Sequence, residues 1–370
     1  MDKSTSIYLD TIRFLASLAV FFHHVFELGV VTTDLRINFA REAVMVFFVL
    51  SGFVISFVAK NKEHNLQDYM VGRLSRLYSV VLPALLLTLL LDTAGMAISP
   101  SLYDMNAHQN VFARMVISLL YLNQMWNLTV FPLSNGPFWS ISYEFWYYLI
   151  FACVFYIHGK KGALLAVILM LLIGPKMLLL FPCWLIGVGA YKIYCGCDTD
   201  SLVWRIAFPI SLLTMFFVIE FGYPTQWIVN IIQAHLHEGY FEVFGQDIFI
   251  GGHVVFLNDY LFCMIFAVSI LSASAFFKGF IEVKLLTRVI RYLFGNTFSL
   301  YLYHVPLLIF FQTVFYESSD SRFYQILILL LTLIVVFLLA RVTEQKKSMY
   351  VTFFNNIIVW VSARKPVRKV

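Results

Sequence analysis

YLDTIRFLASLAVFFHHVFELG, residues Tyr8 to Gly29, decides the fold class, because it reads as a membrane-spanning helix that nevertheless carries ionisable side chains. Among these side chains are Asp10, Arg13, His23 and His24. An ionisable group at bilayer depth costs about 3 kcal/mol unless it is paired or hydrated, so such groups usually mark a functional site. The stretch therefore predicts a membrane helix that also takes part in function.

The composition extends this prediction to the whole chain. Of the 370 residues, 61% are hydrophobic and 13% are charged, whereas soluble domains are about half apolar and a quarter charged. The apolar tracts are about twenty residues long, which indicates helices, since the strands of a membrane β-barrel show only short alternating patterns. The net charge of +5 lies mostly beside these tracts and favours contact with membrane lipids over nucleic acid. We expect an all-α, multi-pass membrane protein.

Ten membrane spans are predicted from the apolar tracts. With the N-terminus in the cytoplasm, the predicted inside segments hold twenty Lys and Arg residues and the outside loops hold five. This bias fits the positive-inside rule with both termini cytoplasmic. The transmembrane domain is expected over residues 1–342, followed by a basic cytoplasmic tail over residues 343–370 on the inner leaflet. The spans are Leu9–Leu28, Val44–Ala59, Leu77–Ala97, Ile141–Tyr156, Ala163–Ile173, Leu178–Ile193, Ile206–Phe221, Val254–Phe277, Thr297–Phe315 and Phe323–Ala340.

Two loops on the predicted outer side are long. The loop between residues 98 and 138 contains Val111–Leu122, an apolar segment too short to span, which is expected to be re-entrant or interfacial. For the loop between residues 222 and 253, a solvated acidic loop is favoured over a metal site. No metal site is therefore expected. The residues weighed in the second loop are His235, His237, Glu238, Glu242 and Asp247.

The first predicted span carries a polar stripe. Arg13 and His24 are eleven residues apart, which is about 20° past three helical turns, so they share one helix face about 16 Å apart. Asp10 lies near the same face, whereas His23 points elsewhere. Taken alone, Arg13 could simply extend its side chain to the inner membrane surface. Taken alone, His24 could simply form a hydrogen bond between helices. The matched pair favours function, in a channel or tunnel.

A second polar site is predicted in NGPFWSISYEFWYYL, residues 135–149. Glu144 lies about five residues inside the outer end of its helix, at the depth expected for His24. A carboxylate there would orient the imidazole and raise its basicity. Trp139 fits either this site or an ordinary band of interfacial aromatic residues.

Three further features are open to two interpretations each. Arg73 and Arg76, one helical turn apart before a span, suit phosphate binding or are ordinary inside charges. Ser51 and Gly52 make room for close helix packing or for a narrow ligand. His304, two residues before a proline, is either a packing residue or a catalytic one.

These residues together resemble the acyltransferase 3 family of membrane acyltransferases. Five segments carry the resemblance, in order along the chain. Two departures are Phe145, where many members have a second acidic residue, and Ser79, where many have proline. The segments are the L-D-x-x-R start with its arginine-x10-histidine spacing at Arg13 and His24, FFVLSGFVIS at 47–56, RLSRLY at 73–78, FWSISYEFWYYL at 138–149 and SLYLYHVPL at 299–307.

The resemblance implies an acyltransferase of the plasma (inner) membrane. It implies acyl-coenzyme A, usually acetyl-coenzyme A, as a cytoplasmic donor substrate, with no permanently bound cofactor. The acceptor would be a hydroxyl group of a cell-surface glycan or lipid-linked saccharide, and polysaccharide-assembly proteins are candidate partners. Some members carry a fused hydrolase-like domain outside the membrane, and no such domain is expected from the residues of this sequence.

The resemblance also assigns roles to the polar residues. His24, oriented by Glu144, would act as general base or as a covalent acyl relay. Arg73 and Arg76 would hold the phosphates of the coenzyme at the inner surface. Arg13 is a further catalytic candidate, and Ser51 and Gly52 are candidates for binding the donor along the route outward. Other candidates are His304, Asp10 and Trp139.

A transporter or flippase of a polysaccharide precursor is the alternative from another class. Polar residues inside the membrane and interrupted helices suit it as well. However, no matching pair of interrupted spans occurs in the two halves of the chain, and the five motifs favour the enzyme.

Overall fold

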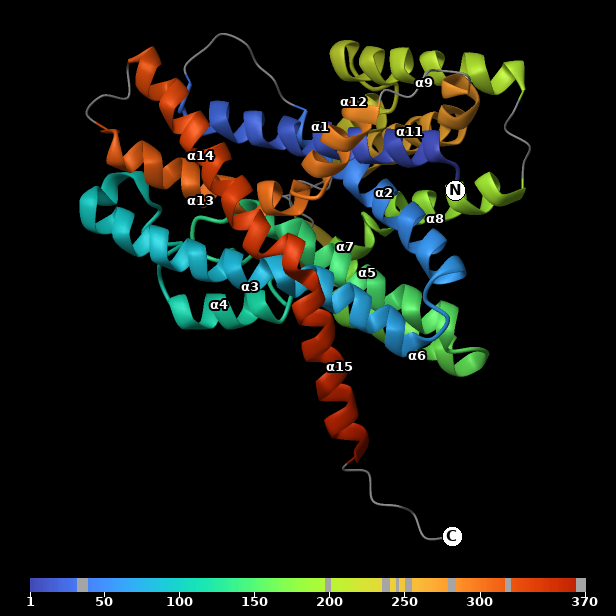
Figure 1. Ribbon diagram of the computed structural model, residues 1–370, viewed down its shortest axis with the longest axis horizontal. Helices are drawn as coiled ribbons and strands as arrows, with labels where there is room; N and C mark the ends of the chain where they lie inside the picture. The colour runs from blue at the N-terminus through green and yellow to red at the C-terminus, as the bar shows by residue number, and fades with distance from the viewer. Residues whose placement is uncertain are drawn as a thin grey trace.

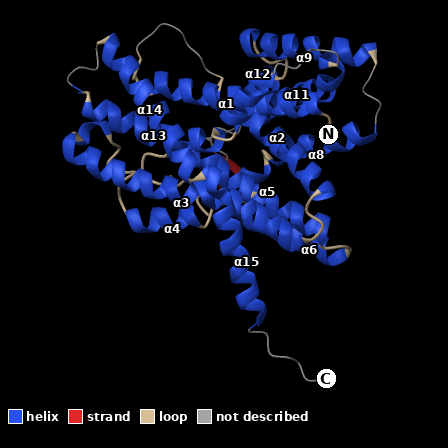
Figure 2. Ribbon diagram, viewed as in Figure 1, coloured by secondary structure: helices blue, strands red, loops and turns tan. Residues whose placement is uncertain are grey.

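The computed structural model describes residues 1–31, 39–196, 201–234, 240–243, 246–249, 255–278, 284–316 and 321–363. It is a bundle of α-helices with one two-stranded antiparallel hairpin (Figure 1, Figure 2). The helices are α1 (Lys3–Glu27), α2 (Ala40–Asn61), α3 (Leu66–Ile98), α4 (Val111–Leu119), α5 (Trp139–Tyr156), α6 (Lys160–Ile173), α7 (Pro175–Leu178), α8 (Phe181–Gly196), α9 (Leu202–Phe221), α10 (Gln226–Ala234), α11 (Phe256–Phe277), α12 (Lys284–Phe294), α13 (Thr297–Val314), α14 (Arg322–Val342) and α15 (Lys347–Ala363). The strands are β1 (Tyr240–Val243) and β2 (Gln246–Phe249), and short 3-10 turns cover Pro100–Leu102, Gly136–Phe138 and Glu344–Lys346.

The prediction of an all-α, multi-pass membrane protein is confirmed. Within the described residues, nine helices are long and apolar enough to cross a membrane, and they coincide with nine of the ten predicted spans. The remaining span falls in α6, which has 14 residues. At 1.5 Å per residue, α6 is about 21 Å long, shorter than the hydrocarbon core of about 30 Å. It ends at Gly174, whose φ of 82° breaks the helix before Pro175 starts α7.

The segment between α3 and α5 turns back along α3, with α4 on the outer side of the bundle and Tyr121 buried behind it. Helix α4 lies alongside α3 (Figure 1), and the Tyr78 hydroxyl donates a hydrogen bond to the Leu119 carbonyl at 3.1 Å. Tyr78 lies about 30 Å along the helix axis before the end of α3, so α4 has returned by that distance along α3. Tyr121 then stacks on Phe145, with ring centroids 4.3 Å apart. This geometry agrees with the re-entrant alternative.

Helices α2 and α8 approach closely because a glycine on each helix faces the backbone of the other helix. A Cβ atom on Gly52 would collide with the carbonyl oxygen of Trp184, and one on Gly187 would collide with that of Val49. Small residues allow such contacts between membrane helices. Of the two interpretations of Gly52, the structure supports helix packing, because Gly52 lines neither of the cavities described below.

We expect Gly52→Ala to lower the free energy of unfolding by about 1–3 kcal/mol, because the added methyl group overpacks the contact with α8. Gly189, also on α8, is the matched control, since nothing lies within 4 Å of its Cβ position. Gly189→Ala should keep or raise stability, because alanine is the better helix former by about 1 kcal/mol. Thermal unfolding in detergent measures both, and equal melting temperatures would contradict the packing assignment.

Helix α13, which carries His304, passes through the centre of the bundle and packs against α1, α3 and α14. Its N-terminus is capped from a distance: the Glu344 carboxylate accepts hydrogen bonds from the backbone N–H groups of Phe298 at 3.4 Å and Ser299 at 2.8 Å. A carboxylate is favourable there because the first N–H groups of a helix have no internal partner. The described part of the predicted tail is therefore joined to the domain through Glu344. It continues into α15, whose first part packs along α3 before the helix extends outward (Figure 1).

Candidate active site

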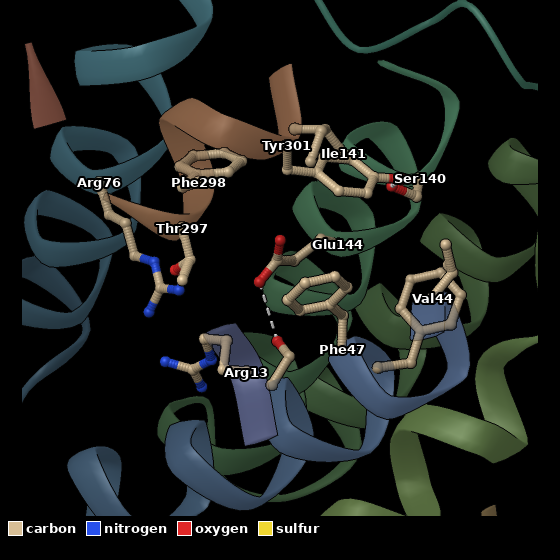
Figure 3. A pocket seen from close by; sticks show the side chains of 12 residues that line it. Arg13, Val44, Phe47, Arg76, Ser140, Ile141, Glu144, Thr297, Phe298 and Tyr301 are labelled. Carbon is tan, nitrogen blue, oxygen red and sulfur yellow. Dashed lines mark hydrogen bonds between the residues drawn. The ribbon is translucent and has the colours of Figure 1, made fainter. Parts of the chain in front are cut away.

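Two cavities lie along the polar stripe of α1. We call them the arginine cavity, of about 50 Å³, and the histidine cavity, of about 530 Å³. Figure 3 shows the first. The arginine cavity is lined by Arg13, Val44, Phe47, Phe48, Ser51, Arg76, Ser140, Ile141, Glu144, Thr297, Phe298 and Tyr301. The histidine cavity is lined by Val20, His23, His24, Glu27, Leu28, Ala40, Arg41, Val44, Met45, Phe131, Ser134, Gly136, Pro137, Trp139, Tyr301, Val305 and Ile309.

His24 in the histidine cavity is paired with His304. Nδ1 of His24 lies 3.0 Å from Nε2 of His304, and the ring centroids are 4.9 Å apart. Nδ1 of His304 lies 2.8 Å from the carbonyl oxygen of Leu300. A carbonyl only accepts, so this nitrogen carries the proton and Nε2 of a neutral His304 is an acceptor.

This arrangement assigns the proton on His24. Its Nδ1 faces two acceptors, Nε2 of His304 and the carbonyl oxygen of Val20 at 2.9 Å. Nδ1 of His24 is therefore protonated, and Nε2 of the neutral ring keeps its lone pair. The nearest carboxylate oxygen to that nitrogen belongs to Glu27, at 3.7 Å. His24 thus presents a base at the histidine cavity.

Glu144 does not orient His24, contrary to the prediction. It lines the arginine cavity, where it accepts a hydrogen bond from Ser51 at 3.0 Å (Figure 3). It accepts a second hydrogen bond from Tyr148. Trp139, at the start of α5, is the residue that reaches the histidine cavity. Because Glu144 comes five residues later, it lies about 7.5 Å further along the helix axis. His304 occupies the position that was predicted for Glu144.

Two cations face Glu144 across the arginine cavity. Figure 3 shows the guanidinium groups of Arg13 and Arg76 on one side of the cavity, with Glu144 opposite. Arg13 is buried, with its guanidinium 4.9 Å from the centroid of the Phe294 ring. Neither guanidinium group forms a hydrogen bond or ion pair with any residue that the structure describes. Since a charge in a low-dielectric site is stabilised by a counter-ion, this cavity is suited to an anionic ligand.

Arg73 and Arg76 are separated by the fold. Arg73 is buried and forms an ion pair with Glu63 at 2.7 Å, while its guanidinium lies over the rings of Tyr69 and Tyr148. It does not line the arginine cavity, whereas Arg76 does. Of the two arginines predicted to bind phosphate, the structure places only Arg76 at a cavity, and the role of Arg73 stays a prediction.

The other predicted site residues divide between the two cavities. Ser51 lines the arginine cavity, where it donates to Glu144 and accepts a hydrogen bond from the Trp184 indole at 3.1 Å. Asp10 is half-buried on α1 and lines neither cavity. His23 was expected to point away from the stripe, but it lines the histidine cavity, with its ring centroid 5.2 Å from that of His24. Adjacent side chains both reach the cavity because it is wide.

Some residues of the site were not found from the sequence. Tyr301 lines both cavities, yet an aromatic residue in an apolar helix gives no functional signal on its own. Arg41 was counted as a loop charge, but it lies at the histidine cavity and pairs with Asp259 at 2.6 Å. The loop residues His235, His237 and Glu238 lie outside the described residues, and of Glu242 and Asp247 only the backbone is described.

Comparison with known proteins gives a family match over most of the chain. The acyltransferase 3 family model, described as an acyltransferase domain, matches residues 6–341. The chain is 25% identical over 312 residues to a Bacillus subtilis (strain 168) protein named "Putative peptidoglycan O-acetyltransferase YrhL". The alignment covers 76% of this chain and 47% of that protein, so the chain spans about half the length of this curated relative. No solved structure matches the chain.

Proposed function

The chain belongs to the acyltransferase 3 family, and from this premise we propose that it transfers an acetyl group from acetyl-coenzyme A to a hydroxyl group of a cell-surface polysaccharide. The observation that carries the proposal is the His24–His304 pair, which leaves Nε2 of His24 free as a base at an open cavity. The name of the Bacillus relative supports an acetyl ester on peptidoglycan or a similar glycan. As a multi-pass membrane protein, it would act in the plasma membrane.

In the proposed reaction, His24 is the general base. Its Nε2 takes the proton of an acceptor hydroxyl in the histidine cavity, and the hydroxyl oxygen attacks the thioester carbonyl carbon. The tetrahedral intermediate collapses as the carbon–sulfur bond breaks, which leaves the acetyl ester and the coenzyme thiolate. The imidazolium then returns its proton to the sulfur. The neutral His304 stabilises the imidazolium, because its Nε2 accepts the Nδ1–H of His24 in both protonation states.

The arginine cavity is the proposed donor site. Coenzyme A carries several phosphate charges, and a thioester oxygen gains negative charge in the transition state. Arg13 and Arg76 supply the opposite charge at the end of the stripe that the charge distribution predicts to be cytoplasmic. With a volume of about 50 Å³, the cavity admits only the narrow thioester end of the donor, and the phosphates of the coenzyme would lie outside it on the cytoplasmic side, within reach of the Arg76 charge. The donor would therefore reach it from the cytoplasmic side through its narrow arm.

The proposal is tested by giving the purified protein labelled acetyl-coenzyme A and soluble peptidoglycan or polysaccharide fragments. An alkali-labile acetyl ester on a fragment hydroxyl supports it. Hydrolysis of the donor without any ester on a panel of such fragments would contradict the assigned acceptor class.

We expect Arg76→Gln to raise KM for acetyl-coenzyme A by about 10- to 100-fold, the loss of roughly 1.5–3 kcal/mol from one charge-assisted contact. This defect should shrink as ionic strength rises, because salt screens the attraction that the wild-type arginine exerts on the donor. Arg73→Gln, one helical turn away, is the matched control. It breaks a buried ion pair with Glu63 and should lower the free energy of unfolding by about 3–5 kcal/mol. It should have no selective effect on KM for acetyl-coenzyme A. Steady-state kinetics and thermal unfolding separate the two. A larger KM effect from Arg73→Gln would place the donor at the other arginine.

A further inference from the structure

A thin partition separates the two cavities. Of the described residues, Val44 and Tyr301 line both of them. The Tyr301 hydroxyl lies 2.7 Å from Oγ of Ser140, and its ring meets Phe47 edge-on at 5.5 Å between centroids. Figure 3 shows Val44 on the side of the arginine cavity opposite Arg13 and Arg76. On the proposed function, the acyl group has to reach its acceptor across this partition.

The side chains of the partition have little freedom to move aside. Tyr301 is 5% exposed and is held by Ser140 at one end and by Phe47 on its ring. Val44 is equally buried, and a β-branched residue in a helix strongly prefers a single χ1 rotamer. A well-packed membrane interior resists added volume at a cost of about 1–3 kcal/mol. The partition therefore yields to a small acyl group at a lower cost than to a longer one.

The space before the partition fits a short acyl group. The arginine cavity, of about 50 Å³, has room for about three to five water-sized groups at 10–15 Å³ each. The methyl group, carbonyl carbon, carbonyl oxygen and sulfur of an acetyl thioester match this space. Each added methylene group of a longer acyl chain has to displace Val44 or Tyr301.

We propose that Val44, packed beside Tyr301 in the partition between the donor and acceptor cavities, limits the transferred group to acetyl. This inference deepens the proposed function and rests on it. Val44 is the selective element because its γ-methyl groups can be removed without breaking a hydrogen bond, whereas Tyr301 is tied to Ser140. The chemistry of transfer is the same for a longer acyl group, and only the fit of the chain differs.

The test compares acetyl-, propionyl- and butyryl-coenzyme A as donors to one saccharide acceptor. The wild type should prefer acetyl over propionyl by about 10-fold or more in kcat/KM, the discrimination that one methylene group typically gives. Val44→Ala should reduce this preference about 10-fold. The control is Val46→Ala, the same substitution at a buried position two residues away that lines neither cavity. It should keep the wild-type ratio.

Val44→Ile adds a methylene group. This variant is the second test of the inference, and it can be used if the alanine variant does not fold. It should sharpen the preference for acetyl. Unchanged donor ratios in both Val44 variants, or a wild type that uses propionyl as well as acetyl, would overturn the inference and leave the acetyltransferase proposal standing. A wild type that transfers none of the three groups would instead contradict the proposed function itself.

Discussion

Replacing His24 with alanine is expected to lower kcat for acetyl transfer by about 10²–10⁴-fold, the range typical of losing a general base. KM for acetyl-coenzyme A should change little, because the donor is proposed to bind at the arginine cavity, which His24 does not line. Loss of the imidazole also removes a partner of His304, so membrane insertion and thermal unfolding have to be measured beside the rate.

His23→Ala is the comparison for this variant, since it removes the same side chain from the adjacent position. His23 also lines the histidine cavity, but its partner is Glu27 at 3.7 Å and no hydrogen bond orients it toward His304. Its effect on kcat should therefore be much smaller. A His24→Ala protein that inserts normally and turns over at the wild-type rate would remove His24 from the chemistry.

Replacing His304 with alanine should lower kcat by about 10- to 100-fold, the usual effect of removing the hydrogen-bond partner that orients a reacting imidazole. In the proposed reaction, His304 is a positioning residue, whose Nε2 accepts the Nδ1–H of His24 and stabilises the imidazolium. KM for the donor should stay the same. Rate measurements under saturating acetyl-coenzyme A isolate this effect.

His304→Gln provides the rescue experiment, because the amide oxygen can accept the Nδ1–H of His24. It should recover part of the lost kcat. If His304 only stabilised the fold, kcat would instead change in parallel with the thermal stability of the variants. Glu144→Gln is expected to act differently, through the proposed donor cavity where Glu144 lies with Ser51 and Arg76. If Glu144→Gln reproduced the kcat loss of His304→Ala with an unchanged donor KM, the two assignments would have to be exchanged.

Features that depend on one helix at a time were predictable from the sequence. The apolar tracts predicted the spans, and Gly174-Pro175 marked the break between α6 and α7, because a glycine with positive φ and a proline both end helices. The shared face of Arg13 and His24 follows from helical periodicity alone. Each of the two residues lines one of the two cavities along that face.

Features that depend on how helices pack were not predictable in the same way. His304 meets His24 across 280 residues of sequence, and no local pattern indicates that α13 lies against α1. Glu144 was placed at the depth of His24 by counting residues from helix ends, an estimate that small shifts in helix position invalidate. Arg73 was grouped with Arg76 by spacing, because its partner Glu63 lies in the preceding loop and pairs only in the folded chain.

The most direct test of the account uses sealed vesicles that contain the purified protein and an enclosed saccharide acceptor. Labelled acetyl-coenzyme A is added outside, and in a second sample donor and acceptor are both outside; neither molecule crosses the bilayer. Since the proposed donor and acceptor cavities lie toward opposite ends of the α1 stripe, the account predicts acetyl ester on the enclosed acceptor and almost none when both substrates share one side. Efficient transfer between substrates on the same side, with none to the enclosed acceptor, would contradict it.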